Sequence, residues 1–499
     1  MTTHQSLALG FFIAIGLVVG VCGEHFEVTS AQQLIKLLDI SKANHFDANI
    51  TLLDDLDFSD SPLTLPFGVS SDGSCVPYTG VFEGNGHTIK GLVMNNEDNQ
   101  GYNKAGLFCA MENATFENLV IDSSCSFTAS SAGALSVSLT GSLTATNVTN
   151  KADVSGNEGV GGFVGMISHI SQEAGVTLKD CVNDGKITGR YNLGGFVGEV
   201  RNNKDFNMSF SDCINNGNLT ARFGLGGFVG NIYDNTNIAM TISNCTNNGI
   251  CTVTQDSVGG FIGCFQDSIS MTMTISDSMN TGMITGVLFV GGLVGVFTTE
   301  PESSLNAFTI INSANKGNVS SEEYACGMFC VISDTTDNLN TTVLNSINKG
   351  SVNATTNAYG ITNIITKARN VVSMGEVNAS SGSFTFWNMS TDVDLFFGMD
   401  GKCVNCTDGT TLFVHKTNTG FYEVVESGEH VHDLLNAEVE KQDYGMFWTK
   451  ELELVDHLVE PSPSPSSQSG GLSGGNKHGV SLFWIGVVVA LAAHVAMTW

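Results

Sequence analysis

The sequence predicts an all-β protein, a parallel β-helix of about nine coils, because two features recur with one period. The first is a glycine-rich pentapeptide at spacings of 33, 32, 33 and 32 residues: GGFVG at Gly161–Gly165, GGFVG at Gly194–Gly198, GGFVG at Gly226–Gly230, GGFIG at Gly259–Gly263 and GGLVG at Gly291–Gly295. The second is an Asn-x-Gly motif, which ends at Gly185, Gly217, Gly249, Gly282, Gly317 and Gly350. Since two independent markers keep the same period, the chain is a repeat protein.

Each repeat consists of short apolar or β-branched runs that glycine and asparagine interrupt. No run is long enough to show the i, i+3, i+4, i+7 spacing of a helix, so helical repeats are disfavoured. We expect the Asn-Gly pairs to form corners with a positive φ, and no unit contains a tight two-residue hairpin. One coil per repeat follows, with equivalent residues of successive coils about 4.8 Å apart. A propeller blade, which needs roughly 40–45 residues, fits less well.

Weaker copies of the pentapeptide extend the array in both directions. They are KAGLFC at Lys104–Cys109, SAGALS at Ser131–Ser136, ACGMFC at Ala325–Cys330 and AYGITN at Ala358–Asn363. About nine coils spaced by roughly 4.8 Å give a column on the order of 40 Å long. We expect the phenylalanine of the pentapeptide to form a stack in the core.

Composition divides the chain into six segments. We expect a signal peptide at 1–23, a segment that leads into the β-helix at 24–104, the repeats at 105–395, a C-terminal capping region at 396–457, a Pro/Ser/Gly-rich stalk at 458–479 and a hydrophobic anchor or lipid-attachment signal at 480–499.

The N-terminus indicates export. Residues from Leu7 to Val21 are apolar, and small residues at Val21 and Gly23 suit cleavage before Glu24. Because no Lys or Arg precedes the apolar core, an uncleaved anchor is the alternative.

The C-terminus indicates attachment to a membrane. The tract from Pro461, PSPSPSSQSGGLSGGNKHG, cannot bury enough apolar surface to fold, and the following segment is almost wholly apolar. Small residues, a polar spacer and an apolar tail match the signal for a glycosylphosphatidylinositol (GPI) anchor, with Ser469 as the first attachment candidate and Ser473 as the second. A single-pass helix, for which about 20 apolar residues suffice, is the alternative. Either kind of anchor would place the protein on the extracellular face of the plasma membrane.

The charge limits the class of partner. The chain has 49 acidic and 20 basic residues, a net charge of −29. Long-range repulsion therefore argues against nucleic acid, anionic polysaccharide or acidic lipid as a partner. Partners are neutral, cationic or reached through local contacts.

Export makes the Asn-x-Ser/Thr sequons candidates for N-glycosylation. The twelve sequon asparagines are Asn49, Asn113, Asn147, Asn207, Asn218, Asn244, Asn318, Asn340, Asn353, Asn378, Asn388 and Asn405.

Export also permits disulfides, and loss of Cys22 would leave twelve of the 13 cysteines. Three of these recur at steps of 32 residues, and serines continue their column: Cys181, Cys213, Cys245, Ser278, Ser313 and Ser346. We expect a stack of small buried side chains there, with disulfide rungs between coils as the alternative. Cys326 with Cys330, and Cys403 with Cys406, are candidates for local disulfides. No second Cys-x-x-Cys completes a zinc site.

The sequence resembles a known family. The segment VFEGNGHTIKGL at Val81–Leu92, the following KAGLFC and ENLVID, and the repeated GGFVG and NNG units resemble the GLUG-repeat β-helix proteins of bacterial and protist cell surfaces. The resemblance covers roughly residues 25–457. It implies a right-handed parallel β-helix, a surface location and a role in adhesion, but no defined activity.

Carbohydrate-active enzymes also use β-helices, so catalysis is the alternative function. Glycoside hydrolysis needs paired carboxylates, and a lyase needs a base with cationic groups. One repeat position carries both acids and amides, at Asp180, Asp212, Asn244, Asp277, Asn312 and Asn345, which suits a ladder of turns better than a catalytic site. His87 and Lys90 lie within the GNGHTIKG segment, and no third ligand joins His430 and His432.

The sequence thus predicts no catalytic residue, no cofactor and no metal. It predicts a surface-anchored glycoprotein for adhesion, recognition or coat formation, with an extracellular glycan or protein as its ligand and no nucleic acid partner.

Overall fold

A computed structural model describes residues 23–39, 46–97, 103–171, 174–299, 306–333, 339–380, 382–393 and 396–398, and four short strands at 413–416, 422–425, 447–448 and 454–455. The chain divides into two units, Met1–His457 and Leu458–Trp499, and every described residue belongs to the first. Several expected features lie outside the described residues: the signal peptide up to Cys22, the stalk, the anchor, Ser469, Ser473, Cys403, Cys406, Asn405, His430 and His432.

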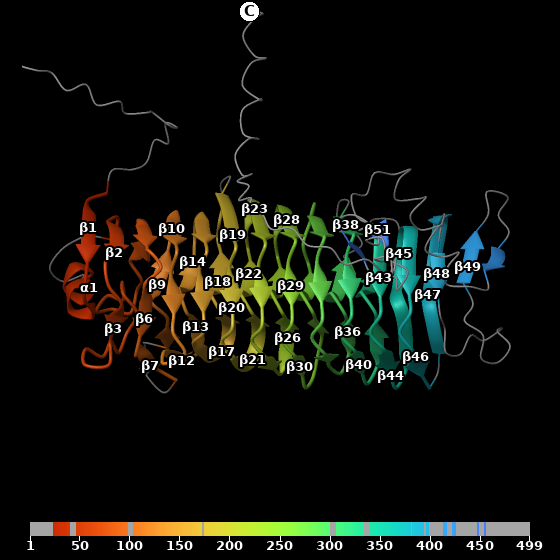
Figure 1. Cartoon of the computed structure of the whole chain (residues 1–499), viewed down its shortest axis with the longest axis horizontal. Coiled ribbons are helices and arrows are strands. Elements are labelled where there is room, and N and C mark those ends of the chain that lie inside the picture. The colour runs from red at the N-terminus through yellow and green to blue at the C-terminus, as the bar shows by residue number, and fades with distance from the viewer. Residues whose placement is uncertain are drawn as a thin grey trace, which may run out of the picture. The chain divides into compact units, whose positions relative to one another are not determined.

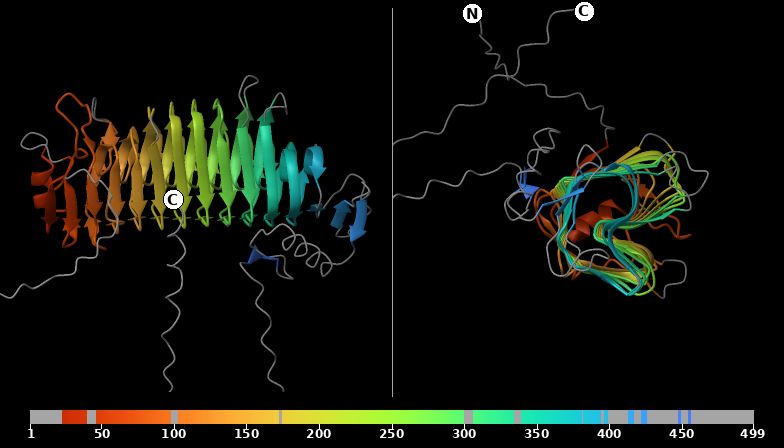
Figure 2. Two further views of the ribbon diagram at one scale, coloured as in Figure 1. Left: turned by 90° about the horizontal axis from the view of Figure 1, so that it is seen from above. Right: turned by 90° about the vertical axis from the view of Figure 1, so that its right-hand side faces the viewer.

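The first unit is a parallel β-solenoid, in which successive coils stack along one axis (Figures 1 and 2). A coil contributes up to five strands, and each strand pairs in parallel with its equivalents in the two neighbouring coils. We number these stacks of strands one to five in chain order. Nine strands form the fifth stack, which agrees with the predicted number of about nine turns.

The strands of the first stack are β1 (His25–Val28), β2 (Asn49–Leu52), β5 (Val81–Glu83), β10 (Ala114–Glu117), β15 (Leu143–Thr146), β19 (Ala174–Lys179), β23 (Lys204–Ser211), β28 (Thr236–Ser243), β33 (Thr272–Ser276), β38 (Asn306–Ile311) and β43 (Leu339–Asn348). The second stack contains β3 (Leu56–Asp57), β6 (Thr88–Lys90), β11 (Val120–Ile121), β16 (Thr149–Asn150), β20 (Val182–Asn183), β24 (Ile214–Asn215), β29 (Thr246–Asn247), β34 (Met279–Asn280), β39 (Ala314–Asn315) and the end of β43.

The third stack contains β7 (Val93–Asn95), β12 (Ser126–Ala129), the first parts of β17 (Asp153–Gly161) and β21 (Ile187–Gly194), β25 (Leu219–Ala221), β30 (Cys251–Val253), β35 (Ile284–Thr285), β40 (Val319–Ser321), β44 (Val352–Ala354) and β46 (Val377–Ala379). The fourth contains β8 (Lys104–Ala105), β13 (Ser131–Gly133), the last parts of β17 and β21, β26 (Phe223–Gly226), β31 (Val258–Gly259), β36 (Phe289–Gly291), β41 (Tyr324–Cys326), the start of β45 (Asn357–Ser373) and β47 (Gly382–Val393).

The fifth stack contains β4 (Pro77–Tyr78), β9 (Phe108–Met111), β14 (Ser136–Leu139), β18 (Val164–Ser168), β22 (Val197–Arg201), β27 (Val229–Tyr233), β32 (Ile262–Gln266), β37 (Val294–Thr299) and β42 (Phe329–Ser333). The end of β45 pairs with β43 and with β48 (Phe396–Gly398). Two antiparallel pairs complete the described strands: β49 (Phe413–Lys416) with β50 (Tyr422–Val425), and β51 (Phe447–Trp448) with β52 (Leu454–Val455).

The phenylalanine of the pentapeptide lies in the core, as predicted. Phe163, Phe196, Phe228 and Phe261 are fully buried, and successive ring centroids are 4.9, 4.8 and 4.9 Å apart. Each coil therefore places its ring on that of the previous coil, and the core is continuous along the column.

The asparagine of the Asn-x-Gly motif forms a buried ladder. The side-chain amide of each asparagine donates to the side-chain oxygen of the next one, with distances of 2.9, 2.8, 2.7, 2.7, 2.8 and 2.8 Å along Asn150, Asn183, Asn215, Asn247, Asn280, Asn315 and Asn348. The same amide also donates to the backbone carbonyl two residues later, for example from Asn247 to Gly249 at 3.1 Å. These side chains are almost fully buried, and their hydrogen bonds satisfy them inside the column.

The expectation that the Asn-Gly pairs form positive-φ corners is wrong. None of the motif glycines has a φ in the left-handed region. Glycine is required instead because the backbones of neighbouring coils approach closely: a Cβ on Gly217 would lie 1.9 Å from the carbonyl oxygen of Gly185.

The two repeat markers also contact each other. A Cβ on Gly227, the second glycine of its pentapeptide, would lie 2.1 Å from the carbonyl oxygen of Gly260 and 2.6 Å from Oδ1 of Asn247. The pentapeptide therefore has a glycine pair partly because the asparagine ladder occupies the space beside it.

The positive-φ corners lie at the repeat position that carries Asp or Asn. Their φ angles fall between 43° and 56° at Asp180, Asp212, Asn244, Asp277, Asn312 and Asn345. The amide of Asn244 donates to the carboxylate of Asp212 at 2.5 Å, that of Asn312 to Asp277 at 2.9 Å and that of Asn345 to Asn312 at 2.8 Å. The position thus forms a second ladder, which is exposed at Asn244 and buried at Asn312 and Asn345. The prediction of a turn ladder at this position is confirmed.

The cysteine and serine column is a stack of small buried side chains, as expected. Cys181, Cys213 and Cys245 are buried free thiols. The backbone N–H of Cys245 donates to Oγ of Ser278 at 3.1 Å, and equivalent bonds continue along the serines.

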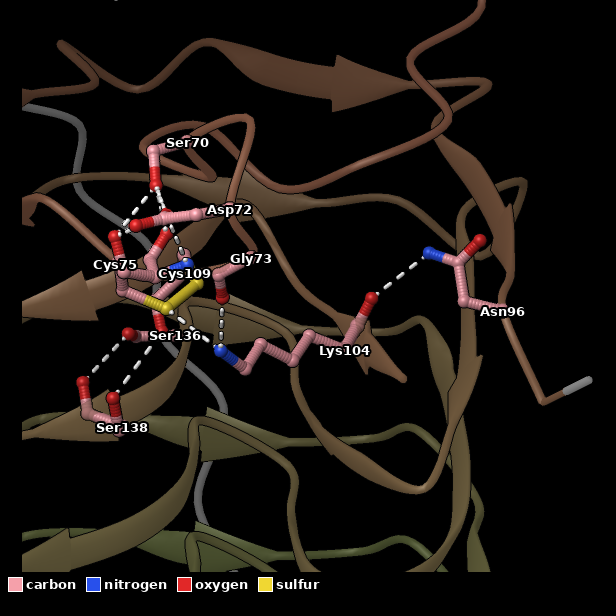
Figure 3. Close-up of a disulfide and its surroundings, with 10 residues drawn as sticks. Ser70, Asp72, Gly73, Cys75, Asn96, Lys104, Cys109, Ser136 and Ser138 are labelled. Atoms are coloured by element: carbon pink, nitrogen blue, oxygen red, sulfur yellow. Dashed lines mark hydrogen bonds between the residues drawn. A yellow bond between two sulfur atoms is a disulfide. The ribbon is translucent and has the colours of Figure 1, made fainter. Parts of the chain in front are cut away.

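Disulfides lie elsewhere in the chain. Cys326 and Cys330 are joined at the end of the fourth and the start of the fifth stack. A second disulfide, Cys75–Cys109, joins the loop before β4 to β9, with the ammonium of Lys104 3.2 Å from Sγ of Cys75 (Figure 3). The sequence did not single out this pair, because 34 residues separate the two cysteines without a recurring spacing.

One helix, α1 (Ala31–Leu37), covers the N-terminal end of the column. Ala31 and Leu34 are buried in the core, and the helix lies within the outline of the coils in the end-on view of Figure 2. The sequence analysis missed it, although Ser30 and Gln33 have the spacing of a capping box and the Gln33 N–H contacts Oγ of Ser30. Within the described part of the chain, no helix has the length and apolar character needed to cross a bilayer.

Candidate functional site

The sequon asparagines divide the surface into two parts. Ten of the twelve have described side chains, and all ten are exposed or half-buried, whereas the asparagines of the buried ladder are not in sequons. They lie on the first and third stacks and in the turns next to them: Asn49, Asn113, Asn147, Asn207, Asn218, Asn244, Asn318, Asn340, Asn353 and Asn378. Asn388 is on β47, and nothing further is described for it. None of the ten is on a strand of the fourth or fifth stack. We call the outer surface of these two stacks as far as β41 and β42, and thus without β47, the sequon-free flank.

The flank carries a cluster that we call the arginine–aromatic patch, formed by Arg190, Tyr191, Arg222 and Phe223. Tyr191 and Phe223 pair in register between β21 and β26, and their rings stack with centroids 5.0 Å apart and an angle of 12°. The guanidinium carbon of Arg190 lies 5.0 Å from the centroid of Tyr191, and that of Arg222 lies 5.3 Å from Phe223. Both arginines are thus held against ring faces by cation–π contacts.

The patch is unusual for this chain. The sequence has only four arginines, and Arg190, Arg201 and Arg222 all lie on the flank within two successive coils. Among the described residues, Arg190 and Arg222 form no ion pair with Asp or Glu. The Nε of Arg222 donates to Oε1 of Gln255 in the next coil at 2.5 Å.

A buried carboxylate lies beside the patch. Glu199 on β22 is 1% exposed, and its Oε1 is 3.2 Å from Nη1 of Arg201. The hydroxyl of Tyr233 on β27 donates to the same carboxylate and accepts from Arg201 at 3.0 Å. Burial and the bond to Glu199 raise the pKa of Tyr233 to about 12, so the phenol stays protonated at neutral pH. The carboxylate of Glu199 is thus paired with Arg201 and with the Tyr233 hydroxyl, while the buried Nε of Arg201 has no hydrogen-bond partner.

Two residues close to this network lie next to Tyr191 or its neighbour in the chain. Glu158 on β17 pairs with Tyr191 and helps to raise the pKa of Arg201, after the larger effects of Tyr233 and Glu199. The amide of Asn231 donates to Oδ1 of Asn192, the residue after Tyr191, at 3.2 Å. The patch therefore lies on a fixed part of the solenoid, not on a loop.

The histidine and lysine of the GNGHTIKG segment both contact the carboxylate of Asp55 on the surface. Nζ of Lys90 lies 2.6 Å from Oδ2 of Asp55, and Nδ1 of His87 lies 3.5 Å from Oδ1 of the same residue. The bond from Lys90, and then the N–H of Thr88, lower the pKa of Asp55. All three side chains are substantially exposed, and an exposed pair such as Lys90 with Asp55 contributes about 0–1 kcal/mol to stability. Over the described residues, no three His, Cys, Asp or Glu side chains come together as a metal site.

Two shallow grooves lie outside the flank. One, of about 830 Å³, crosses β19, β23, β28 and β33, and Asn207 lines it. The other, of about 400 Å³, crosses β40, β44 and β46, and Asn353 and Asn378 line it. Because sequon asparagines line both grooves, a glycan attached there would occupy the groove. On the flank, most strand residues are buried, and the arginine–aromatic patch is among the parts that remain accessible.

The arginine–aromatic patch was not among the sites predicted from the sequence, although the chain carries a signal for it. The runs RYNLGG from Arg190 and RFGLGG from Arg222 stand 32 residues apart, with Arg and an aromatic residue at the same distance before each pentapeptide. Only the register of the coils reveals that the two arginines are neighbours.

Known proteins match this chain only in part. No protein-family profile matches the chain. It is 32% identical over 155 residues to halomucin of Haloquadratum walsbyi, a match that covers 30% of this chain and 2% of the length of halomucin. Among solved structures, it is similar to a Bacteroides ovatus protein provisionally named an immunoglobulin A1 protease, with a TM-score of 0.39, 16% identity, and coverage of 82% of this chain and 94% of that one.

Proposed function

We propose that this protein is a glycoprotein of the cell surface, held at its C-terminus by a GPI anchor or a single membrane helix, that acts in adhesion or recognition without catalysis. The observation that carries the proposal is the arginine–aromatic patch on the sequon-free flank. Arg and aromatic residues are the side chains that most often dominate protein interfaces. Glycans on the other surfaces would leave this flank accessible.

The resemblance to GLUG-repeat surface proteins supports the same function. The alternative, a carbohydrate-active enzyme, has less support. Arg201 neutralises the buried Glu199, and Tyr233 remains protonated. Neither group is available for proton transfer to a substrate.

The experiment compares the full chain, made through a eukaryotic secretory pathway, with two variants in a binding screen against cells, immobilised glycans and extracellular proteins. The patch variant carries Arg190→Ser, Tyr191→Thr, Arg222→Ser and Phe223→Thr. The control carries Thr144→Ala, Thr177→Ala and Thr241→Ala on the exposed face of the first stack. We expect the patch variant to lose at least about tenfold in affinity, or about 1.4 kcal/mol, while the control binds normally. No binding by the wild type, or equal losses in both variants, would refute the proposal, and turnover of any glycan would favour the enzyme.

The anchor has a separate test. Phosphatidylinositol-specific phospholipase C should release the protein from intact cells, and Ser469→Leu should abolish this release unless Ser473 substitutes for it. Complete retention after phospholipase treatment would show that the tether is a membrane helix.

A further inference from the structure

The two arginines of the patch lie directly above one another in neighbouring coils. The backbone N–H of Arg222 donates to the carbonyl oxygen of Arg190 at 3.2 Å, next to the in-register pair of Tyr191 and Phe223. Like charges directly opposite each other in a sheet are destabilising. In a chain with 49 acidic residues, no carboxylate among the described residues neutralises this pair. The pair therefore has the charge and position to receive an anionic group from outside.

The geometry favours a carboxylate as that group. A guanidinium is a planar fork that matches a carboxylate with two parallel hydrogen bonds. The rings of Tyr191 and Phe223 hold both guanidinium groups, so little side-chain freedom remains to be lost on binding.

The negative charge of the rest of the protein limits how many negative charges the ligand can carry. A net charge of −29 repels a polyanion before it reaches the patch, whereas a ligand with one negative group experiences much weaker repulsion. The groups around the arginines are polar and include one carboxylate. The amide of Gln255 accepts from Arg222, Asn157 is exposed, and the next residue, Glu158, is an exposed acid that pairs in register with Tyr191, whose hydroxyl has no hydrogen-bond partner among the described residues. Glu158 adds to the repulsion of a ligand with several negative charges. These amide and hydroxyl groups suit a ligand rich in hydroxyls.

We propose that Arg190 and Arg222 together bind the carboxylate of an acidic sugar at the end of an otherwise neutral glycan. The inference rests on the proposed function, for which it names the class of ligand.

The test measures binding of the full chain by isothermal titration calorimetry with two matched pairs of probes. They are 3′-sialyllactose against lactose, and methyl β-glucuronide against methyl β-glucoside, in which the members of a pair differ in the acidic group. We expect at least one acidic probe to bind tenfold or more tightly than its neutral counterpart. We expect the preference to weaken as sodium chloride is raised, because salt screens exposed charges.

Variants assign the preference to the arginines. Arg190→Gln with Arg222→Gln removes both charges but keeps hydrogen-bonding amides, and should reduce the preference for the acidic probe to less than twofold. Arg190→Lys with Arg222→Lys keeps the positive charge but removes the planar guanidinium group and its two parallel donors. This variant should retain an intermediate preference for the acidic probe. Lys186→Gln, at an exposed position off the flank, is the matched control and should bind as the wild type does.

Each outcome separates this inference from the proposed function. Equal binding of acidic and neutral probes, or an acidic preference that the glutamine variant keeps, overturns the inference and leaves recognition standing. Failure of every sugar probe to bind, while the patch variant still loses binding to cells, also overturns the inference alone. Failure of the wild type to bind anything in the broader screen overturns the proposed function and the inference together.

Discussion

At the scale of single residues, the asparagine ladder explains the Asn-x-Gly motif better than turn geometry does. Asn247 accepts from Asn215 at 2.7 Å and donates to Asn280 at 2.7 Å and to the carbonyl of Gly249. A buried amide without these partners would cost about 1–3 kcal/mol. Each coil thus supplies the partner that its neighbour requires.

We predict that Asn247→Ala lowers the free energy of unfolding by about 2–4 kcal/mol, because it leaves the Gly249 carbonyl and the Asn280 side chain without their donors. The exposed neighbour Asn248 is the control, and Asn248→Ala should cost less than about 1 kcal/mol. Urea unfolding followed by far-UV circular dichroism measures both. Equal losses in the two variants would contradict the role of the ladder.

A second prediction concerns pH. Burial raises the pKa of Asp256 above its ordinary value of 3.8, although the hydroxyl and N–H of Ser257 partly oppose this. The folded state therefore binds the proton more tightly than the unfolded state, so stability is highest below the ordinary pKa and falls as pH rises through the folded value. Asp256→Asn should raise the Tm at pH 7 and leave it unchanged near pH 3. A Tm gain that does not depend on pH would refute this account.

The sequence was informative about residues where a pattern recurs. The Asp/Asn position was correctly interpreted as a turn ladder, because the interchange of these two residues is typical of a positive φ. The asparagine ladder was missed, because its hydrogen bonds join residues 32 to 35 positions apart and depend on the register of the coils. The Cys75–Cys109 disulfide was missed for the same reason.

At the scale of elements, the pentapeptide forms the corner between the fourth and fifth stacks. Its first glycine lies close to backbone of its own coil, since a Cβ on Gly226 would be 2.0 Å from the carbonyl oxygen of Val229. Its second glycine faces the asparagine ladder, and its phenylalanine enters the core. Within the five pentapeptides, these contacts leave no space for a larger residue at the first and second glycine, whereas Cys326 takes the register position of Gly291 in the next coil.

We predict that Gly227→Ala destabilises the protein by about 3 kcal/mol or more, since the new methyl group would overlap the backbone of Gly260 and the side chain of Asn247. Gly175→Ala is the matched control, because a Cβ there meets no atom within 4 Å. Its effect should stay within about 0.5 kcal/mol. Thermal unfolding of the two variants checks the prediction, and a tolerated Gly227→Ala would show that the coils are less closely spaced than described here.

The elements of the repeat were predictable from the sequence, and those outside it were less so. Period, strand content and the phenylalanine stack followed from a pattern that repeats many times. The cap helix α1 occurs once, so only its local capping residues could have revealed it.

At the scale of the whole molecule, the distribution of sequons is the feature most closely linked to function. The ten sequons with described side chains lie off the strands of the fourth and fifth stacks. Tyr191 and Phe223 of the arginine–aromatic patch lie on strands of the fourth stack, and Arg222 immediately precedes one. The sequence alone could not predict this separation, because the face of a sequon depends on the register of its coil. Once the register is known, each sequon can be assigned to a face.

The measurement that tests the account most directly is the binding of a variant with a glycan placed on the flank. Gln255→Asn creates the sequon Asn-Asp-Ser beside Arg222, and Ile250→Thr creates Asn-Gly-Thr at exposed Asn248, away from the flank. Gln255→Ala removes the same side chain without adding a glycan. If the flank is the recognition surface, glycosylated Gln255→Asn binds at least tenfold more weakly than Gln255→Ala, while glycosylated Ile250→Thr binds within about threefold of the wild type. Full binding by glycosylated Gln255→Asn would contradict the account.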